Sequence, residues 1–214
     1  MKERVSSPVW QVPIEGYSIG GAVLAGGLST RMGHDKASLL RRTVLGRMQP
    51  ESATWLERQL DLLGQCGLRH RVVSWHAERP SPVLPTDVLL VRDRVENQGP
   101  LAGIEAVLSR IETSAVLVLA VDLQRMTPRL LNELIAMAKT QTGVIPFIDD
   151  RFEPLAAIYP QSCLTEVKRR LDEGRLSLQE LIRSGCDDGW LSPWEVPQEW
   201  AREFANWNYP SDIE

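Results

Sequence analysis

Four short apolar runs recur along this 214-residue chain, and stretches with helical periodicity separate most of them. The runs are rich in Val, Leu and Ile, and they are too short to cross a membrane as helices. They occupy residues 20–25, 71–75, 88–91 and 115–121. Strands that alternate with helices favour parallel pairing through helical crossovers. The sequence therefore predicts an α/β fold with a doubly wound sheet that helices cover on both faces.

The stretches between and after these runs place apolar residues at the spacing of amphipathic helices. Pro100 suits a first helical turn, and Thr127 is predicted to cap the helix that begins at Pro128. The last two helices are each expected to open on a capping residue. The helical stretches are 51–65, 100–112, 127–139, 163–174 and 177–185, and one further strand is expected over 151–160.

Composition excludes several classes of protein. The formal net charge is −4 and Lys and Arg are spread along the chain, which does not fit a nucleic-acid binder. The three cysteines lie far apart without a paired motif, so neither a disulfide framework nor a zinc site is indicated. The first 17 residues lack a continuous apolar core, so we expect a polar N-terminal tail rather than a signal peptide or membrane span. We expect residues 18–214 to form one cytoplasmic domain.

Ligands of doubly wound sheets bind beyond the carboxyl ends of the strands, so residues that follow a strand are the candidates for a site. Gly26 and Gly27 follow the first apolar run, and Arg31 and Lys36 bring two cations to the same segment. Glycine allows close backbone approach to a ligand, and consecutive N–H groups can cup an anion. Neither standard phosphate-loop motif is matched, so a solvated turn is the competing interpretation.

Two carboxylates also follow predicted strands. Asp122 ends the most hydrophobic run, where a hard oxygen ligand could hold Mg²⁺, although Asp is also a common turn or cap residue. Asp93 follows the run at 88–91, and the small residues of GPLAG, at 99–103, then begin a helix that could face an anion or a base edge. The histidines show no metal-ligand spacing, and no Ser/His/Asp arrangement is apparent.

Taken together, these segments resemble a known family. LAGGLSTRMGHDK, at residues 24–36, is similar to the signature L-A-G-G-x-S-x-R-M-G-x-D-K of the molybdenum cofactor guanylyltransferase (MobA-like) family of nucleotidyltransferases. Further matches follow in order. They are VRD ending at Asp93, GPLAGI at 99–104, Asp122 after its strand, EPLAAIYP at 153–160 and F-x-N-x-N-x-P-x-D at 204–212.

The resemblance implies a three-layer αβα sandwich with a Rossmann-like, mainly parallel sheet of the nucleotide-diphospho-sugar transferase type. It also implies roles for individual residues. The nucleotide-binding set is Leu24, Ala25, Gly26, Gly27, Lys36, Ser74, Asp93 and Asp122, of which Ser74 aligns only loosely. Asp122 would hold Mg²⁺ and would be catalytic together with Arg31 and Lys36, and Asn206 and Asn208 would lie on the acceptor side.

The activity implied is transfer of GMP from GTP to the phosphate of a molybdopterin-type acceptor, with release of pyrophosphate. Contacts with proteins that mature molybdenum enzymes are also implied. The segment after Asp122 departs from the family pattern, because Gln124 and Arg125 displace the expected proline. A cytidylyltransferase, a sugar-phosphate nucleotidyltransferase and a non-catalytic nucleotide-binding protein therefore stay open as alternatives.

Overall fold

A computed structural model describes residues 17–26, 54–93 and 98–205 of the chain. Five of the predicted site residues fall outside these ranges, namely Gly27, Arg31, Lys36, Asn206 and Asn208. The predicted N-terminal tail also lies outside them, except for its last residue. Tyr17 is partly buried and packs against the hydrophobic core.

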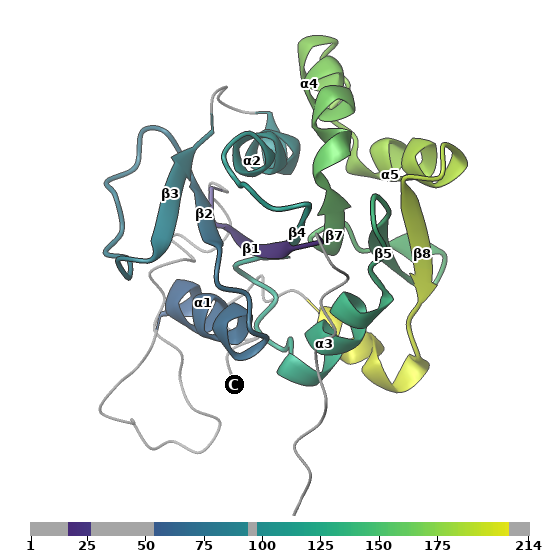
Figure 1. The fold of residues 1–214 in the computed structure, drawn as a ribbon, viewed down its shortest axis with the longest axis horizontal. Coiled ribbons are helices and arrows are strands. Elements are labelled where there is room, and N and C mark those ends of the chain that lie inside the picture. The colour runs from purple at the N-terminus through teal and green to yellow at the C-terminus, as the bar shows by residue number, and fades with distance from the viewer. Residues whose placement is uncertain (1–16, 27–53, 94–97, 206–214) are drawn as a thin grey trace, which may run out of the picture.

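The described residues form one mixed sheet in the order β3-β2-β1-β4-β7-β5-β6, with β8 paired to β5 (Figure 1). The strands are β1 (Ile19–Leu24), β2 (Arg71–Trp75), β3 (Val88–Arg92), β4 (Ala115–Ala120), β5 (Gly143–Ile148), β6 (Arg151–Phe152), β7 (Ala156–Pro160) and β8 (Leu191–Glu195). The neighbours β3, β2, β1 and β4 all pair in parallel. Strand β7 is antiparallel to both β4 and β5, whereas β8 runs parallel to β5.

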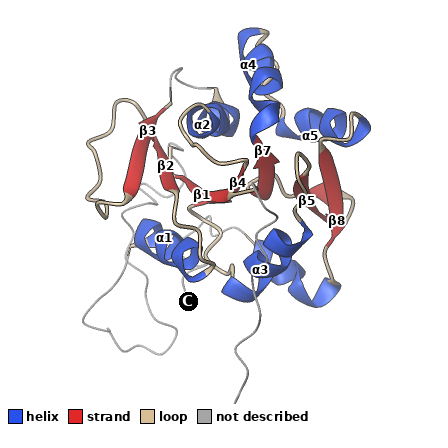
Figure 2. Ribbon diagram, viewed as in Figure 1, coloured by secondary structure: helices blue, strands red, loops and turns tan. Residues whose placement is uncertain are grey.

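Helices cover both faces of this sheet (Figure 2). They are α1 (Trp55–Gln65), α2 (Gly99–Leu108), α3 (Pro128–Met137), α4 (Leu164–Asp172) and α5 (Leu178–Asp187), with the 3-10 helices η2 (Gln161–Cys163) and η3 (Gln198–Phe204). The core accordingly divides into two clusters. One contains buried Leu60 of α1 and Leu130 of α3, and the other contains Ile104 of α2 and Val167 of α4. The predicted α/β fold with three layers is thus confirmed.

Helix ends follow the predicted caps at two of three positions. The Thr127 hydroxyl accepts a hydrogen bond from the N–H of Leu130 at 3.4 Å, and the Ser177 hydroxyl accepts one from Glu180 at 3.3 Å. The cap expected for the 163–174 helix is wrong, because the 3-10 turn η2 leads directly into α4 and Cys163 makes no side-chain capping bond. A preceding helical turn replaces the side-chain cap there.

The second half of the sheet differs from the prediction. Residues 151–160 form two strands with a turn between them rather than one strand. Strands β5 and β8 were not predicted, and both contain a proline, Pro146 and Pro193, that breaks the sequence signal for a strand. Strand β8 pairs with β5 alone in the described part of the sheet. On the outer side of β8 no second strand requires a hydrogen bond from the N–H group that Pro193 lacks.

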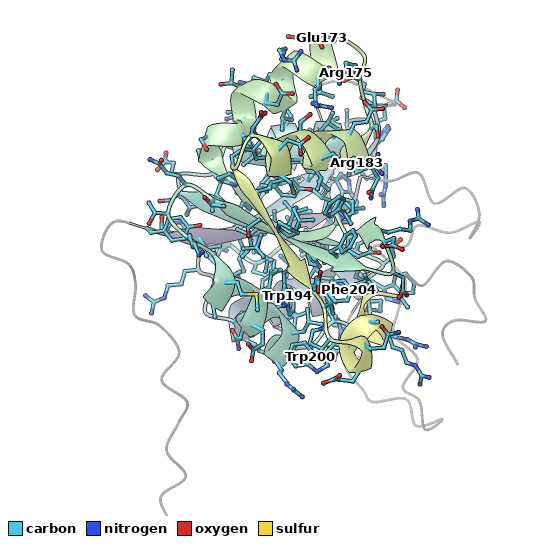
Figure 3. The ribbon with its side chains drawn as sticks, turned by 90° about the vertical axis from the view of Figure 1, so that its right-hand side faces the viewer. Glu173, Arg175, Arg183, Trp194, Trp200 and Phe204 are labelled. Carbon is cyan, nitrogen blue, oxygen red and sulfur yellow. The ribbon has the colours of Figure 1, made fainter. Side chains whose placement is uncertain are left out.

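The C-terminal 3-10 helix η3 packs beside α3. Figure 3 shows Trp194, Trp200 and Phe204 together on the side of the sheet opposite Glu173 and Arg175. The Trp194 and Trp200 rings meet edge to face with centroids 6.1 Å apart, and the Arg129 guanidinium lies 4.5 Å from the Trp200 centroid. The C-terminal helix η3 therefore contacts α3, the helix that follows Asp122. None of the helices in the described ranges is both long and apolar enough to cross a membrane.

Candidate functional site

The carboxyl ends of β1, β2, β3 and β4 meet at one edge of the sheet. Backbone hydrogen bonds continue past the strand ends, from the Ala25 N–H to the Ser74 carbonyl at 3.0 Å and from the Val121 N–H to the Leu24 carbonyl at 3.1 Å. A third bond joins the Asp93 N–H to the Trp75 carbonyl at 3.2 Å. Four separate segments of the sequence therefore converge on this edge, as the parallel pairing requires.

Ser74, Asp93 and Gly26 form the compact centre of this edge. The Ser74 hydroxyl donates a hydrogen bond of 2.6 Å to Oδ1 of Asp93. A Cβ atom placed on Gly26 would lie 2.8 Å from Oδ2 of the same carboxylate, closer than packed atoms allow. The absence of a side chain at Gly26 thus lets the backbone lie directly against the carboxylate. Ser74, a predicted nucleotide contact, thus lies beside Asp93, which is another.

Helix α2 closes one side of the same centre. A Cβ atom on Gly103 would lie 2.9 Å from the Ser74 hydroxyl oxygen and 3.3 Å from Cδ2 of Leu24. Gly103, the last of the small residues of GPLAG, allows the α2 backbone to lie close to the ends of β1 and β2. This packing fixes Ser74, which is 1% exposed, between two elements.

The carboxyl group of Asp93 is in an unfavourable place for a charge. Burial raises the pKa of Asp93, while the Ser74 hydrogen bond and nearby His76 lower it and the charge of Glu105 adds to the rise. The burial effect is the largest, so ionisation costs the folded protein free energy. A carboxylate that is buried at a strand end, where its charge costs folding free energy, is a candidate for ligand binding.

Replacing Asp93 by Asn should raise the melting temperature at pH 7. The folded protein holds the Asp93 proton more tightly than the unfolded chain does, so stability falls as pH rises through the carboxyl's titration range. Asn removes this cost and keeps an acceptor for Ser74. The gain should vanish at a pH low enough to protonate Asp93 in both states. Melting curves of both proteins across the acidic range measure this.

Asp87→Asn is the control with the opposite sign. Asp87 is bonded to the Arg71 guanidinium, which lowers the pKa of Asp87, so its loss should decrease stability at pH 7. A melting temperature for Asp93→Asn that lies below wild type at pH 7 and does not depend on pH would contradict the burial argument.

Asp122 lies in the turn that follows β4 and is half-buried. Its neighbour Gln124, which departs from the family pattern, is 2% exposed and does not occupy the edge of the sheet. The Gln124 amide instead donates to the Val121 carbonyl at 2.6 Å within the turn. Gln124, which departs from the family pattern, is thus a buried part of the turn itself.

The donor set at Asp122 fits a hard divalent cation. In the described ranges, no three His, Cys, Asp or Glu side chains gather as a protein-only metal site. Mg²⁺ typically keeps several waters and is bound by one or two carboxylates together with substrate phosphates. A single strand-end carboxylate such as Asp122 is consistent with that mode of binding.

A loop after β2 joins the site without having been predicted from the sequence. The Arg79 guanidinium lies 4.0 Å from the centroid of the Trp75 ring and donates to the Ala25 carbonyl at 3.0 Å. Arg92 then holds the loop by donating to the carbonyls of His76, Ala77 and Arg79. The sequence around Arg79 does not indicate this contact, because the Ala25 carbonyl follows a different strand, β1.

All six described members of the predicted site therefore lie at one edge of the sheet. They are Leu24, Ala25, Gly26, Ser74, Asp93 and Asp122. A family model for the MobA-like NTP transferase domain matches residues 21–188, a range that contains them all. The chain belongs to the MobA-like NTP transferase family.

Three proteins illustrate how much of this chain its relatives and structural neighbours cover. A probable molybdenum cofactor guanylyltransferase of Opitutus terrae is 33% identical over 198 residues, which cover 91% of this chain and 93% of the relative. Molybdopterin-guanine dinucleotide biosynthesis protein A of Archaeoglobus fulgidus is 22% identical with a TM-score of 0.65 over 91% of this chain and 94% of that one. A Mycobacterium tuberculosis protein solved in complex with manganese is 18% identical with a TM-score of 0.57, over 85% and 89%. The two solved structures share the fold of this chain.

Proposed function

We propose that this chain transfers GMP from GTP to the phosphate of a molybdopterin-type acceptor and releases pyrophosphate. The observation that carries the proposal is the convergence of Gly26, Ser74 and Asp93 with the Asp122 turn at one edge of the parallel strands. Membership of the MobA-like family supports it, as does the guanylyltransferase relative that aligns over nearly the whole chain. The cytidylyl and sugar-phosphate alternatives share this fold, so substrates must distinguish them.

On the donor side, the backbone of Leu24–Gly26 would lie against the nucleotide. Gly26 has no side chain to hold a ligand away, and Asp93 offers a carboxylate acceptor beside it. The Ser74 hydrogen bond fixes the orientation of that carboxylate before a ligand arrives. Preorganised polar groups of this kind lower the cost of binding.

On the phosphate side, Asp122 would hold Mg²⁺, which when bound would neutralise charge on the triphosphate. Arg31 and Lys36 are proposed to contact phosphate oxygens from the glycine-rich loop. The acceptor phosphate is already ionised, so its oxygen can attack the α-phosphorus without a general base. The new bond joins the acceptor oxygen to the α-phosphorus, and the bond to the β-phosphate oxygen breaks in line. Such transfer depends on positioning and charge neutralisation rather than on a covalent nucleophile.

Pyrophosphate release from matched substrate pairs tests this assignment. We expect Mg²⁺-dependent release with GTP and molybdopterin to exceed release with CTP, or with sugar phosphates as acceptors, by at least about 100-fold. A preference for CTP would instead support a cytidylyltransferase, and a preference for a sugar phosphate would support a sugar-phosphate nucleotidyltransferase. Tight GTP binding in calorimetry with no turnover on any acceptor would support a non-catalytic nucleotide-binding protein.

A further inference from the structure

The turn that carries Asp122 is held from below by side chains of helix α1. Gln59 of α1 is fully buried, and its side-chain amide donates to the Leu123 carbonyl at 2.8 Å and to the Ala120 carbonyl at 3.3 Å. These two carbonyls flank Asp122 on either side. One side chain, more than 60 residues away in the sequence, therefore holds both ends of the segment that presents the carboxylate.

Two more side chains complete this support. Gln124 donates to the Val121 carbonyl at 2.6 Å and makes a longer contact of 3.5 Å with the Trp55 carbonyl at the start of α1. Arg58, next to Gln59, donates to the Met126 carbonyl at 2.8 Å. We call Gln59, Gln124 and Arg58 the turn brace. Together they bind the carbonyls of residues 120, 121, 123 and 126.

Gln59 is a polar residue in apolar surroundings. Its helix neighbours Leu56, Leu60 and Leu63 are buried in the apolar cluster beneath the sheet, as is Met126. Burying an amide costs free energy unless hydrogen bonds replace those with water. The Ala120 carbonyl also accepts from the Leu123 N–H, and the Leu123 carbonyl accepts from the Met126 N–H, both at 3.3 Å. Gln59 therefore adds a second donor to each of two turn hydrogen bonds. These two bonds satisfy the buried Gln59 amide and tie the turn to helix α1.

We propose that Gln59 is a positioning residue that holds Asp122 in the orientation needed for divalent-cation binding. The inference deepens the proposed function and rests on it for the role of Asp122. Groups that orient a metal-binding side chain often matter to metal affinity almost as much as the ligand itself. Gln59 acts on the backbone carbonyls on either side of Asp122 rather than on the carboxylate, so it constrains the turn itself.

The test is Gln59→Met, which keeps the length and shape of the side chain but removes the N–H donors. We expect the affinity for Mn²⁺ in the presence of GTP, measured by electron paramagnetic resonance of the free ion, to fall about tenfold. The Mg²⁺ concentration for half-maximal pyrophosphate release should rise by the same factor. Hydrogen exchange of residues 121–126 should accelerate relative to the rest of the core.

Gln161→Met is the matched control. The Gln161 amide donates to the Leu108 carbonyl at 2.6 Å, and its backbone N–H bonds Ser114 just before β4, at the opposite edge of the sheet. This variant loses the same kind of bond away from Asp122, so its Mn²⁺ affinity should equal that of wild type. Equal loss in both variants would mean a general effect of stability and would overturn the proposal.

Two further measurements keep the outcomes distinct. Gln124→Met removes a different part of the turn brace, so it provides the same test if Gln59→Met does not fold. Wild-type protein that binds neither Mn²⁺ nor GTP would refute the proposed function, whereas unchanged hydrogen exchange at residues 121–126 in folded Gln59→Met would refute the brace independently of any ligand. Unchanged Mn²⁺ affinity in folded Gln59→Met would overturn the positioning role.

Discussion

Replacing Asp122 by Asn should reduce Mg²⁺-dependent pyrophosphate release by roughly 1000-fold. The amide keeps the size of the side chain but loses the negative charge that a hard cation requires. The turn brace binds main-chain carbonyls, so we expect it to hold the turn in place and the melting temperature to change little. Initial rates at saturating GTP and acceptor, measured across a range of Mg²⁺ concentrations, test this expectation.

Asp172→Asn is the control for this experiment, because Asp172 is an exposed carboxylate at the end of α4. It should leave the rate unchanged. If Asp122→Asn keeps more than about a tenth of the wild-type rate, the metal-binding role of Asp122 is wrong. Excess Mg²⁺ should not restore activity, because the missing charge is part of the ligand itself.

The largest expected effect on stability comes from Gly143→Ala in strand β5. A Cβ atom there would lie 2.1 Å from the Ile158 carbonyl oxygen of β7, and 2.8 Å from both Leu191 and Pro160. The nearest atom belongs to the backbone of a central strand, so it cannot rotate away. We expect the free energy of unfolding to fall by about 3 kcal/mol, which urea denaturation would measure.

Gly64→Ala offers a matched comparison within helix α1. Its added methyl group would approach the Arg71 guanidinium nitrogen at 3.2 Å, and a long side chain can shift by that amount. Because Gly is unfavourable inside a helix, this variant should be neutral or stabilising by up to about 1 kcal/mol. Equal destabilisation of both variants would show that the contact with Ile158 does not govern the cost at Gly143.

The first half of the fold could be predicted because its strands are uninterrupted apolar runs. Residues 71–75 form a strand with the predicted bounds, and the runs that became β1, β3 and β4 differ by one residue at one or both ends. Strands β5 and β8 could not be predicted in the same way. Pro146 lies inside β5 and Pro193 inside β8, so tertiary packing rather than local preference makes these segments extended.

In the candidate site, too, residues at strand ends could be predicted, whereas contacts set by tertiary packing could not. Asp93 and Asp122 could be proposed because each follows a strand, and strand ends are visible in the sequence. The bond between Ser74 and Asp93 depends on the parallel register of β2 with β3, which no local pattern specifies. Gln59 is still harder to predict, because a glutamine on the buried face of a helix gives no indication of which distant carbonyls it binds.

Strand β7 runs opposite to β4, so it is the beginning of β7 that reaches the edge occupied by Asp122. The Ala120 N–H bonds the Leu155 carbonyl at 2.8 Å, just beyond the short turn that follows β6. A loop grafted between Phe152 and Ala156 would therefore emerge beside Asp122 without lengthening any connection among β1, β2, β3 and β4. Residues added in the β6–β7 turn would therefore extend the surface around Asp122 and leave the four parallel strands unchanged.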